Sequence, residues 1–273
     1  MGENRHNPDQ LLKAIQADEE NRNKGHLKIF FGYAAGVGKT YAMLEAAHMA
    51  KQQGIDVVAG YIEPHACPKT AALLNGLEVL PTREVLYNGM ILNEFDIDMA
   101  LKRKPQLILV DELAHTNAEG CRHAKRYQDI KELLNAGIDV YTTVNVQHIE
   151  SLCDTVSSIT EIVVQERIPD SLFDNADQVK LMDIEPQDLI DRLNTGNVYR
   201  QTQAKQVVEN FFTIENLTAL REIALRRCAD RVNILTENAR IKNHGDYHTD
   251  EHILVCRNIF LTFPILQTFQ PIH

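Results

Sequence analysis

The sequence lacks several features that would assign it to a special class of protein. Its 273 residues include no tryptophan and five cysteines, which form no C-x-x-C pair. Cysteines that are odd in number and widely spread argue against a disulfide scaffold or a zinc site, and they fit a reducing compartment. No apolar run approaches the roughly 18 to 20 residues that a membrane-spanning helix needs. The polar N-terminus also has no signal-peptide core. These absences predict a cytoplasmic protein without a membrane span.

Positive charge is also scarce. The 28 Lys and Arg residues stand against 38 Asp and Glu, which gives a formal net charge of −10. Direct binding of nucleic acid needs a basic surface, so the composition argues against it. With 44% hydrophobic and 24% charged residues, the chain has the composition of an ordinary globular protein. Its length fits one large domain or two modest ones.

Short apolar runs alternate with helical patterns over the first two thirds of the chain. This alternation is typical of a parallel sheet that is buried on both faces, and it predicts an α/β fold. The expected strands are Leu27–Phe31, Asp56–Ile62, Leu107–Val110, Ile138–Val144, Glu161–Val164 and Val179–Met182. The expected helices between them are Lys39–Gln53, Lys125–Asn135 and Gln147–Ser157.

The strand pattern stops after Pro186. Three helical patterns follow, at Gln187–Leu193, Gln201–Phe212 and Glu215–Asn238, and one strand-like run comes later, at His252–Cys256. The sequence therefore predicts a polar N-terminal arm (residues 1–25), an α/β domain (26–185), a helical extension (186–241) and a final segment (242–273).

A glycine-rich segment lies between the first expected strand and the first expected helix. In such a segment glycines let backbone N–H groups curl round a phosphate, and the helix N-terminus adds its dipole. Lys39 would reach the β- and γ-phosphates, and the Thr40 hydroxyl would bind Mg²⁺. Gly-rich turns without a ligand also occur. The predicted nucleotide-binding residues here are Gly32, Ala35, Gly36, Val37, Gly38, Lys39, Thr40 and Tyr41.

The segment departs from the strict P-loop pattern G-x-x-x-x-G-K-[ST] at one position. That pattern requires glycine at position 33, where this chain has Tyr33, and Gly32 comes one residue early. The first turn of the loop must therefore be built differently, and the motif is a variant.

Two carboxylates follow the strand Leu107–Val110 directly. Asp111 at the end of this strand would hold Mg²⁺ together with Thr40, as a Walker-B aspartate does. Glu112 would polarise a water for attack on the γ-phosphate, which makes it the candidate catalytic residue. The alternative is that Glu112 only caps the next segment.

Further polar side chains come at the ends of neighbouring strands. His115 and Asn117 follow the acidic strand, and Thr143, Asn145 and Gln147 lie at the end of the next one. Ligands bind at this edge of open α/β sheets, so these residues are candidates for contact with the nucleotide. Ordinary hydrogen bonding within a loop is the alternative.

A basic cluster, Arg122–Arg126, also follows the acidic strand. It could contact phosphates or a partner protein, but a solvent-exposed helix start is the commoner arrangement.

Several of these strings occur in the order found in a known family. They are residues 36–40 (GVGKT), 110–117 (VDELAHTN), 122–130 (RHAKRYQDI), 142–152 (TTVNVQHIESL) and 219–227 (ALREIALRR). Together they resemble the cytoplasmic N-terminal domain of the KdpD family, the osmosensitive potassium-channel sensor histidine kinases. The resemblance runs from about Gly25 to Val232. The early first glycine is in keeping with it.

The resemblance implies a regulatory ATP-binding module with ATP and Mg²⁺ as its ligands. In that family the module precedes a universal-stress-protein-like domain, four membrane spans and a histidine kinase core, which are its expected partners. His252–Cys256 resembles the start of the stress-protein-like domain, but the sequence from Arg257 onward no longer fits it. A truncated gene and a genuine hydrophobic tail are two interpretations.

Three functional hypotheses follow. The first is a regulatory nucleotide-binding module of a potassium-responsive two-component system. The second is a stand-alone P-loop ATPase or phosphotransferase that acts on a small molecule. The third is an adaptor for a separately encoded kinase.

Overall fold

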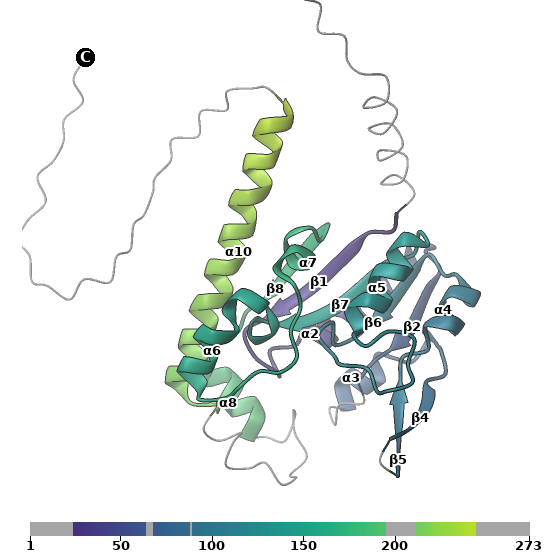
Figure 1. Cartoon of the computed structure of the whole chain (residues 1–273), viewed down its shortest axis with the longest axis horizontal. Coiled ribbons are helices and arrows are strands. Elements are labelled where there is room, and N and C mark those ends of the chain that lie inside the picture. Colours follow the sequence, from purple (N-terminus) through teal and green to yellow (C-terminus); the bar gives the residue numbers. More distant parts are fainter. Residues whose placement is uncertain (1–23, 64–67, 88, 195–210, 244–273) are drawn as a thin grey trace, which may run out of the picture. The chain divides into compact units, whose positions relative to one another are not determined.

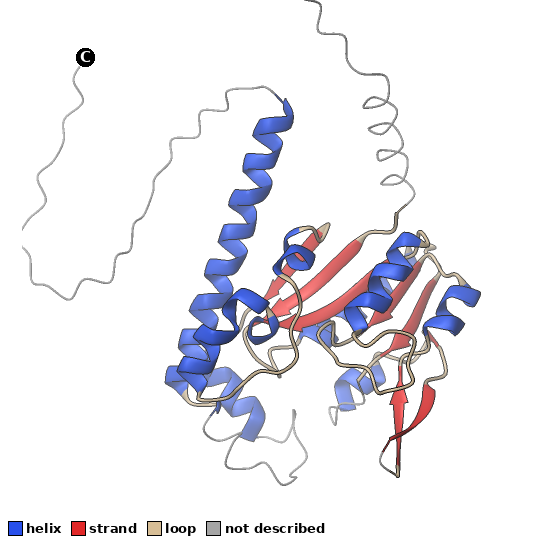
Figure 2. Cartoon of the chain, viewed as in Figure 1, coloured by secondary structure: helices blue, strands red, loops and turns tan. Residues whose placement is uncertain are grey.

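The structure is a computed structural model, and it describes residues 24–63, 68–87, 89–194 and 211–243. The chain divides into two units, Met1–Ile234 and Leu235–His273, and the fold below is that of the first. Helices cover both faces of a central sheet, so the α/β class predicted from the sequence is confirmed (Figures 1 and 2). Three expectations, the polar arm, most of the helix Gln201–Phe212 and the strand His252–Cys256, lie outside the described residues.

The central sheet has six strands in the order β3-β2-β6-β7-β1-β8, and all of its pairings are parallel. All the strands therefore end at the same edge of the sheet, called here the carboxyl edge. The bounds are β1 Leu27–Gly32, β2 Val57–Tyr61, β3 Glu78–Val79, β6 Leu107–Val110, β7 Asp139–Asn145 and β8 Gln178–Met182.

Alternating side chains of the strands enter two separate hydrophobic cores. Phe30 packs with α2 and Leu109 on one face, whereas Phe31 packs with Ile108 and α5 on the other. A strand buried on both faces needs an unbroken apolar run, which is why these strands were recognisable in the sequence. The helices are α2 Lys39–Gln52, α3 Pro68–Ala72, α4 Ile97–Arg103, α5 Arg126–Asn135, α6 Cys153–Thr160, α7 Asp170–Asp174, α8 Pro186–Asn194 and α10 Ile214–Asn243.

A β-hairpin that the sequence did not predict stands apart from the main sheet. It consists of β4 (Arg83–Tyr87) and β5 (Met90–Glu94), which pair antiparallel and project from the body of the molecule (Figure 2). The apolar side chains near its tip are exposed, so the hairpin shows no clear periodic pattern. Its last residue, Glu94, is buried against the main body.

Two other expectations were wrong in detail. Glu161–Val164 is a loop and not a strand, because Glu161 ends α6 in the left-handed conformation with φ of 58°. The expected helix Gln147–Ser157 begins instead as two short 3₁₀ turns, Val146–His148 and Glu150–Leu152, and the α-helix starts only at Cys153.

Candidate functional site

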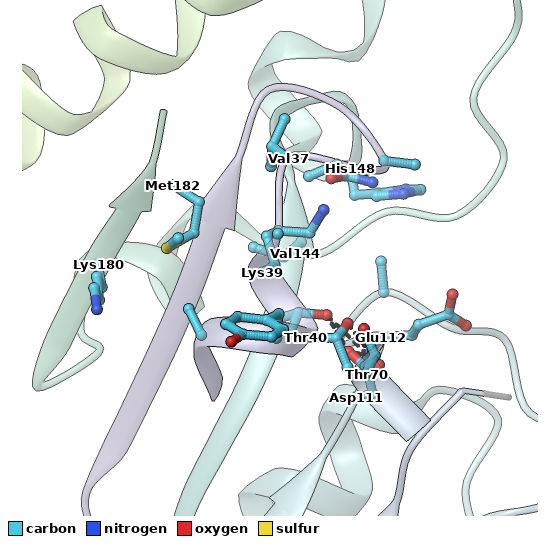
Figure 3. Close-up of a pocket in the computed structure, with 18 of the residues that line it drawn as sticks. Val37, Lys39, Thr40, Thr70, Asp111, Glu112, Val144, His148, Lys180 and Met182 are labelled. Atoms are coloured by element: carbon cyan, nitrogen blue, oxygen red, sulfur yellow. Dashed lines mark hydrogen bonds between the residues drawn. The ribbon is translucent and has the colours of Figure 1, made fainter. Parts of the chain in front are cut away.

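A cavity of about 800 Å³ opens at the carboxyl edge of the sheet. Its walls come from the loop after β1, the start of α2, the ends of β6 and β7, and strand β8 (Figure 3). A cavity of this size suits a ligand as large as a nucleotide. The structure therefore brings the segments that the sequence singled out to one place.

The loop after β1 requires glycine at several positions. Gly36 and Gly38 have φ of 89° and 99°, a left-handed conformation that side chains disfavour. A Cβ on Gly32 would lie 2.5 Å from Cγ2 of Val37, so the chain can fold tightly only without one. Gly38 precedes α2 and provides no side-chain cap, which leaves the N–H groups of the first turn available to an anion.

Tyr33, the departure from the strict motif, has a structural role. Its ring is almost fully buried, and its hydroxyl donates a hydrogen bond to the carbonyl oxygen of Ile184 at 3.0 Å. Burial raises the pKa of this hydroxyl to about 12, so it remains a donor. The bond ties the glycine loop to the segment after β8, which a glycine at position 33 could not do.

Lys39 projects from the first turn of α2 into the cavity and is buried. Its ammonium donates to the carbonyl oxygen of Ala34 at 3.0 Å, across the glycine loop. Burial lowers its pKa to about 8, against the opposing effect of Asp111 and Glu112. A negatively charged ligand would stabilise the charged form of this side chain.

Asp111 is completely buried at the end of β6. The Thr40 hydroxyl donates to its Oδ2 at 3.0 Å, and the Thr143 hydroxyl donates to its Oδ1. The predicted pair of Mg²⁺ ligands, Thr40 and Asp111, is therefore in direct contact. In the described part of the chain no group of three or more His, Cys, Asp or Glu could hold a metal. One carboxylate and one hydroxyl fit Mg²⁺ that is shared with substrate phosphates.

Glu112 lines the cavity in a strained conformation. Its φ of 57° is left-handed, which is uncommon for a residue with a side chain. Burial, reinforced by the charges of Glu63 and Asp111, raises the pKa of its carboxyl group to about 7. A carboxylate with this pKa can exchange protons near neutral pH.

Of the other predicted residues, some lie on the cavity wall and one does not. Thr143, Asn145, Gln147 and His115 all lie on the cavity wall. The Oδ1 atom of Asn145 is buried without a partner in the described structure, so it can accept a hydrogen bond from a ligand or a water.

Asn117 does not reach the cavity wall. Its amide nitrogen donates to the Asp129 carboxylate at 2.7 Å and to the carbonyl oxygen of His123 at 2.9 Å. For this residue, hydrogen bonding within the loop accounts for the geometry.

For Arg126, one of the alternatives offered for the basic cluster, an exposed helix start, is wrong. The side chain is fully buried, and its guanidinium lies 4.0 Å from the ring centroid of Tyr61. It donates to the Glu94 carboxylate at 3.0 Å and to the carbonyl oxygen of Asp111 at 3.3 Å. Arg126 therefore connects the base of the β4–β5 hairpin to the acidic end of β6.

Several residues on the cavity wall carried no recognisable signal in the sequence. They are His148, Glu166, Lys180, Met182, Ile184 and Arg192. Four of these come from β8 and the residues after it, and β8 is the neighbour of β1 in the sheet. Only the strand order, which the sequence did not predict, brings them beside the glycine loop.

The comparisons with known proteins decide the family. The family profile described as "Osmosensitive K+ channel His kinase sensor domain" (KdpD) matches residues 23–232. The chain belongs to this KdpD sensor domain family. The Sensor protein KdpD of Clostridium acetobutylicum is 58% identical over 92% of the chain, and that of Escherichia coli is 53% identical over 92%. A relative from Synechocystis sp. is 48% identical over 85% of the chain and 62% of its own length.

The chain corresponds to only part of its full-length KdpD relatives. It spans 28% of the length of the Clostridium and Escherichia proteins. Among the described residues, no helix is long and apolar enough to cross a membrane. The KdpD family assignment predicted from the sequence motifs is confirmed.

Proposed function

We propose that this KdpD sensor domain binds MgATP at the carboxyl edge of its sheet and serves as a regulatory module of a potassium-responsive sensor kinase. The observation that carries the proposal is the contact of Thr40 with Asp111 at 3.0 Å beside the buried Lys39. The hydroxyl and the carboxylate that would hold Mg²⁺, and the lysine that would bind phosphate, come from the start of α2 and the end of β6 and lie in one cavity.

Each of the site residues would contact a different part of the phosphate chain. The loop 36–38 and the open first turn of α2 would surround the β-phosphate, and Lys39 would reach the β- and γ-phosphates. Thr40 and Asp111 would hold Mg²⁺, whose chemistry here is neutralisation of phosphate charge. The buried Oδ1 of Asn145 would accept a hydrogen bond from a water at the γ-phosphate end.

A chain of contacts leads from the glycine loop to α10, which supports a regulatory role. The Tyr33 hydroxyl binds the carbonyl oxygen of Ile184. On either side of that residue, Asp183 and Glu185 form ion pairs with Arg221 of α10, at 2.7 Å and 2.6 Å. A nucleotide that alters the loop can therefore bias the helix, provided its affinity differs between the two conformations. The partner of this helix would be the kinase part of the same system.

Lys39→Ala tests the proposal. Removal of the ammonium eliminates charge-assisted bonds to two phosphates, so MgATP should bind roughly 100-fold more weakly or not at all. The measurement is a calorimetric titration, with circular dichroism to verify the fold. Lys102→Ala, at an exposed lysine of α4, is the matched control and should bind like the wild type. Equal affinity in the Lys39 variant and the wild type would contradict the proposal.

Glu112 supports a second candidate function, hydrolysis of ATP or transfer of its phosphate. Its left-handed backbone and its raised pKa at the cavity suit a general base. Because a base must be ionised, the single-turnover rate should rise with pH through about 7 and then level off. Glu112→Gln should remove this pH dependence and slow the reaction by about 10² to 10⁴.

The turnover rate of ATP hydrolysis distinguishes a regulatory module from an enzyme. A regulatory module hydrolyses slowly, whereas about 1 per second or more would indicate a true phosphotransferase or ATPase. A rate that is the same in Glu112→Gln and the wild type at every pH would exclude Glu112 as the base.

A further inference from the structure

The cavity continues past the phosphate site toward β8. In Figure 3 Lys180 and Met182 lie on one side of β1 and of the labelled Thr40, and Asp111 and Glu112 lie on the other side. The sheet order β6-β7-β1-β8 explains this arrangement. A ligand whose phosphates lie at Thr40 and Asp111 can therefore extend across the end of β1 toward β8.

The width of this part of the sheet suits an extended nucleotide. Three strand spacings of about 4.8 Å separate β6 from β8, so the two sides are about 14 Å apart. With the γ-phosphate beside Asp111, the chain of phosphates crosses the end of β1. The sugar and the base then reach β8.

Tyr41 provides an aromatic surface on the cavity wall. It lies in the first turn of α2, lines the cavity and is 39% exposed. Aromatic side chains of this kind stack on nucleobases.

The opposite wall combines apolar contact with a hydrogen-bond donor. The apolar residues Met182 and Ile184 line the cavity, and so does Lys180, whose side chain ends in an ammonium group. The Lys180 ammonium lies 5.9 Å from the ring centroid of Phe30, over the core on the α2 face. An ammonium only donates hydrogen bonds, so its complement is an acceptor on the edge of the ligand.

We propose that this end of the cavity is a purine-binding subsite, in which the base stacks on Tyr41, contacts Met182 and turns its N7 acceptor edge toward Lys180. Every purine has an acceptor at N7, whereas pyrimidines have a carbon–hydrogen group at the corresponding place. The subsite rests on the proposed binding of MgATP and adds selection of the base to it. Tyr41, Met182 and Lys180 all lie outside the glycine loop, so the sequence motif of that loop does not predict the subsite.

Two ligands separate the subsite from the phosphate site. Mg²⁺–tripolyphosphate contains the phosphates without a base, and MgATP contains both. Calorimetry on the whole chain should show that Tyr41→Ala weakens MgATP about ten-fold or more, the effect of one lost stacking contact. Tripolyphosphate should bind the variant and the wild type equally. Tyr41→Phe retains the ring and is the control, with ATP affinity within about two-fold of the wild type.

Lys180→Met tests the proposed contact between Lys180 and the N7 edge of the base. The variant has a side chain of similar length without the ammonium group. In the wild type ATP and GTP should bind about ten-fold more tightly than CTP, and in Lys180→Met this preference should shrink to about two-fold. Lys102→Met is the matched control and should retain the full preference.

The outcomes distinguish the two proposals. If neither tripolyphosphate nor ATP binds the wild type, the proposed function itself fails. If both bind equally, or if Tyr41→Ala and Lys180→Met weaken tripolyphosphate as much as ATP, the purine subsite is wrong and the phosphate site stands. An equal affinity of the wild type for CTP and ATP would also overturn the subsite.

Discussion

The two edges of the central sheet use carboxylates in opposite ways. At the amino edge, Asp139 accepts a hydrogen bond from the backbone N–H of His26, and Asp177 accepts one from Leu27, each at 2.7 Å. The side chain of Asp177 remains 45% exposed. At the carboxyl edge Asp111 is fully buried, and its oxygens are bound by the hydroxyls of Thr40 and Thr143.

The difference separates the carboxylates that serve the fold from those that we propose serve a ligand. An exposed carboxylate that caps a strand satisfies a backbone donor at little cost to folding. A buried carboxylate loses its hydration, which is unfavourable unless a partner compensates for it. At the carboxyl edge this unfavourable burial coincides with the buried Lys39 and the strained Glu112. Several energetically unfavourable features in one place are typical of a functional site.

The largest expected effect compares two arginines. Arg126→Met removes the buried guanidinium from Glu94, which then retains His115 and the backbone N–H of Ala118 as partners, so the free energy of unfolding should fall by about 3 kcal/mol. Arg103→Met removes the ion pairs of a partly exposed arginine with Asp56 and Glu78 near the amino edge and should cost much less. Urea unfolding measures both. Equal losses would show that burial does not distinguish the two edges.

A smaller change in the free energy of unfolding is expected where a residue other than glycine has a left-handed backbone conformation. Glu112→Gly relieves the backbone strain and should stabilise the protein by about 1 kcal/mol at neutral pH. Lys104→Gly, at the left-handed end of α4, is the matched control. Thermal or urea unfolding of both variants is the measurement.

The gain at Glu112 should depend on pH, whereas the gain at Lys104 should not. The pKa of Glu112 is about 7 in the folded protein, above its ordinary value of 4.5. Its contribution to stability is therefore present below its unfolded pKa and is lost as the pH rises through about 7. Because the variant has no such group, its advantage should be larger at pH 8 than at pH 5. A gain that is constant over this range would contradict the placement of the carboxyl group.

The sequence was sufficient to predict what local motifs and the common end of parallel strands determine. The loop after β1, Thr40 with Asp111, and the strand end at Thr143 follow from local strings and from the rule that parallel strands end together. The buried strands were recognisable from their unbroken apolar runs.

Features that depend on distant pairings were not predictable from the sequence. The ion pair of Arg126 with Glu94 joins residues 32 positions apart, and it needs a hairpin whose tip is exposed on both faces. The contact of Tyr33 with Ile184 spans 151 positions, and it arises only because β8 pairs with β1. Neither pairing leaves a pattern that a single sequence displays.

The Mg²⁺ dependence of ATP binding tests the central claim most directly. In the wild type, calorimetry should show tighter binding of ATP with Mg²⁺ than with EDTA. In Asp111→Asn this Mg²⁺-dependent gain should disappear, while binding in EDTA is retained, because the amide no longer provides the negative charge beside Thr40. Asp139→Asn, at the amino edge, should behave like the wild type. The same Mg²⁺ dependence in Asp111→Asn and in the wild type would contradict the assignment of the carboxyl edge as the MgATP site.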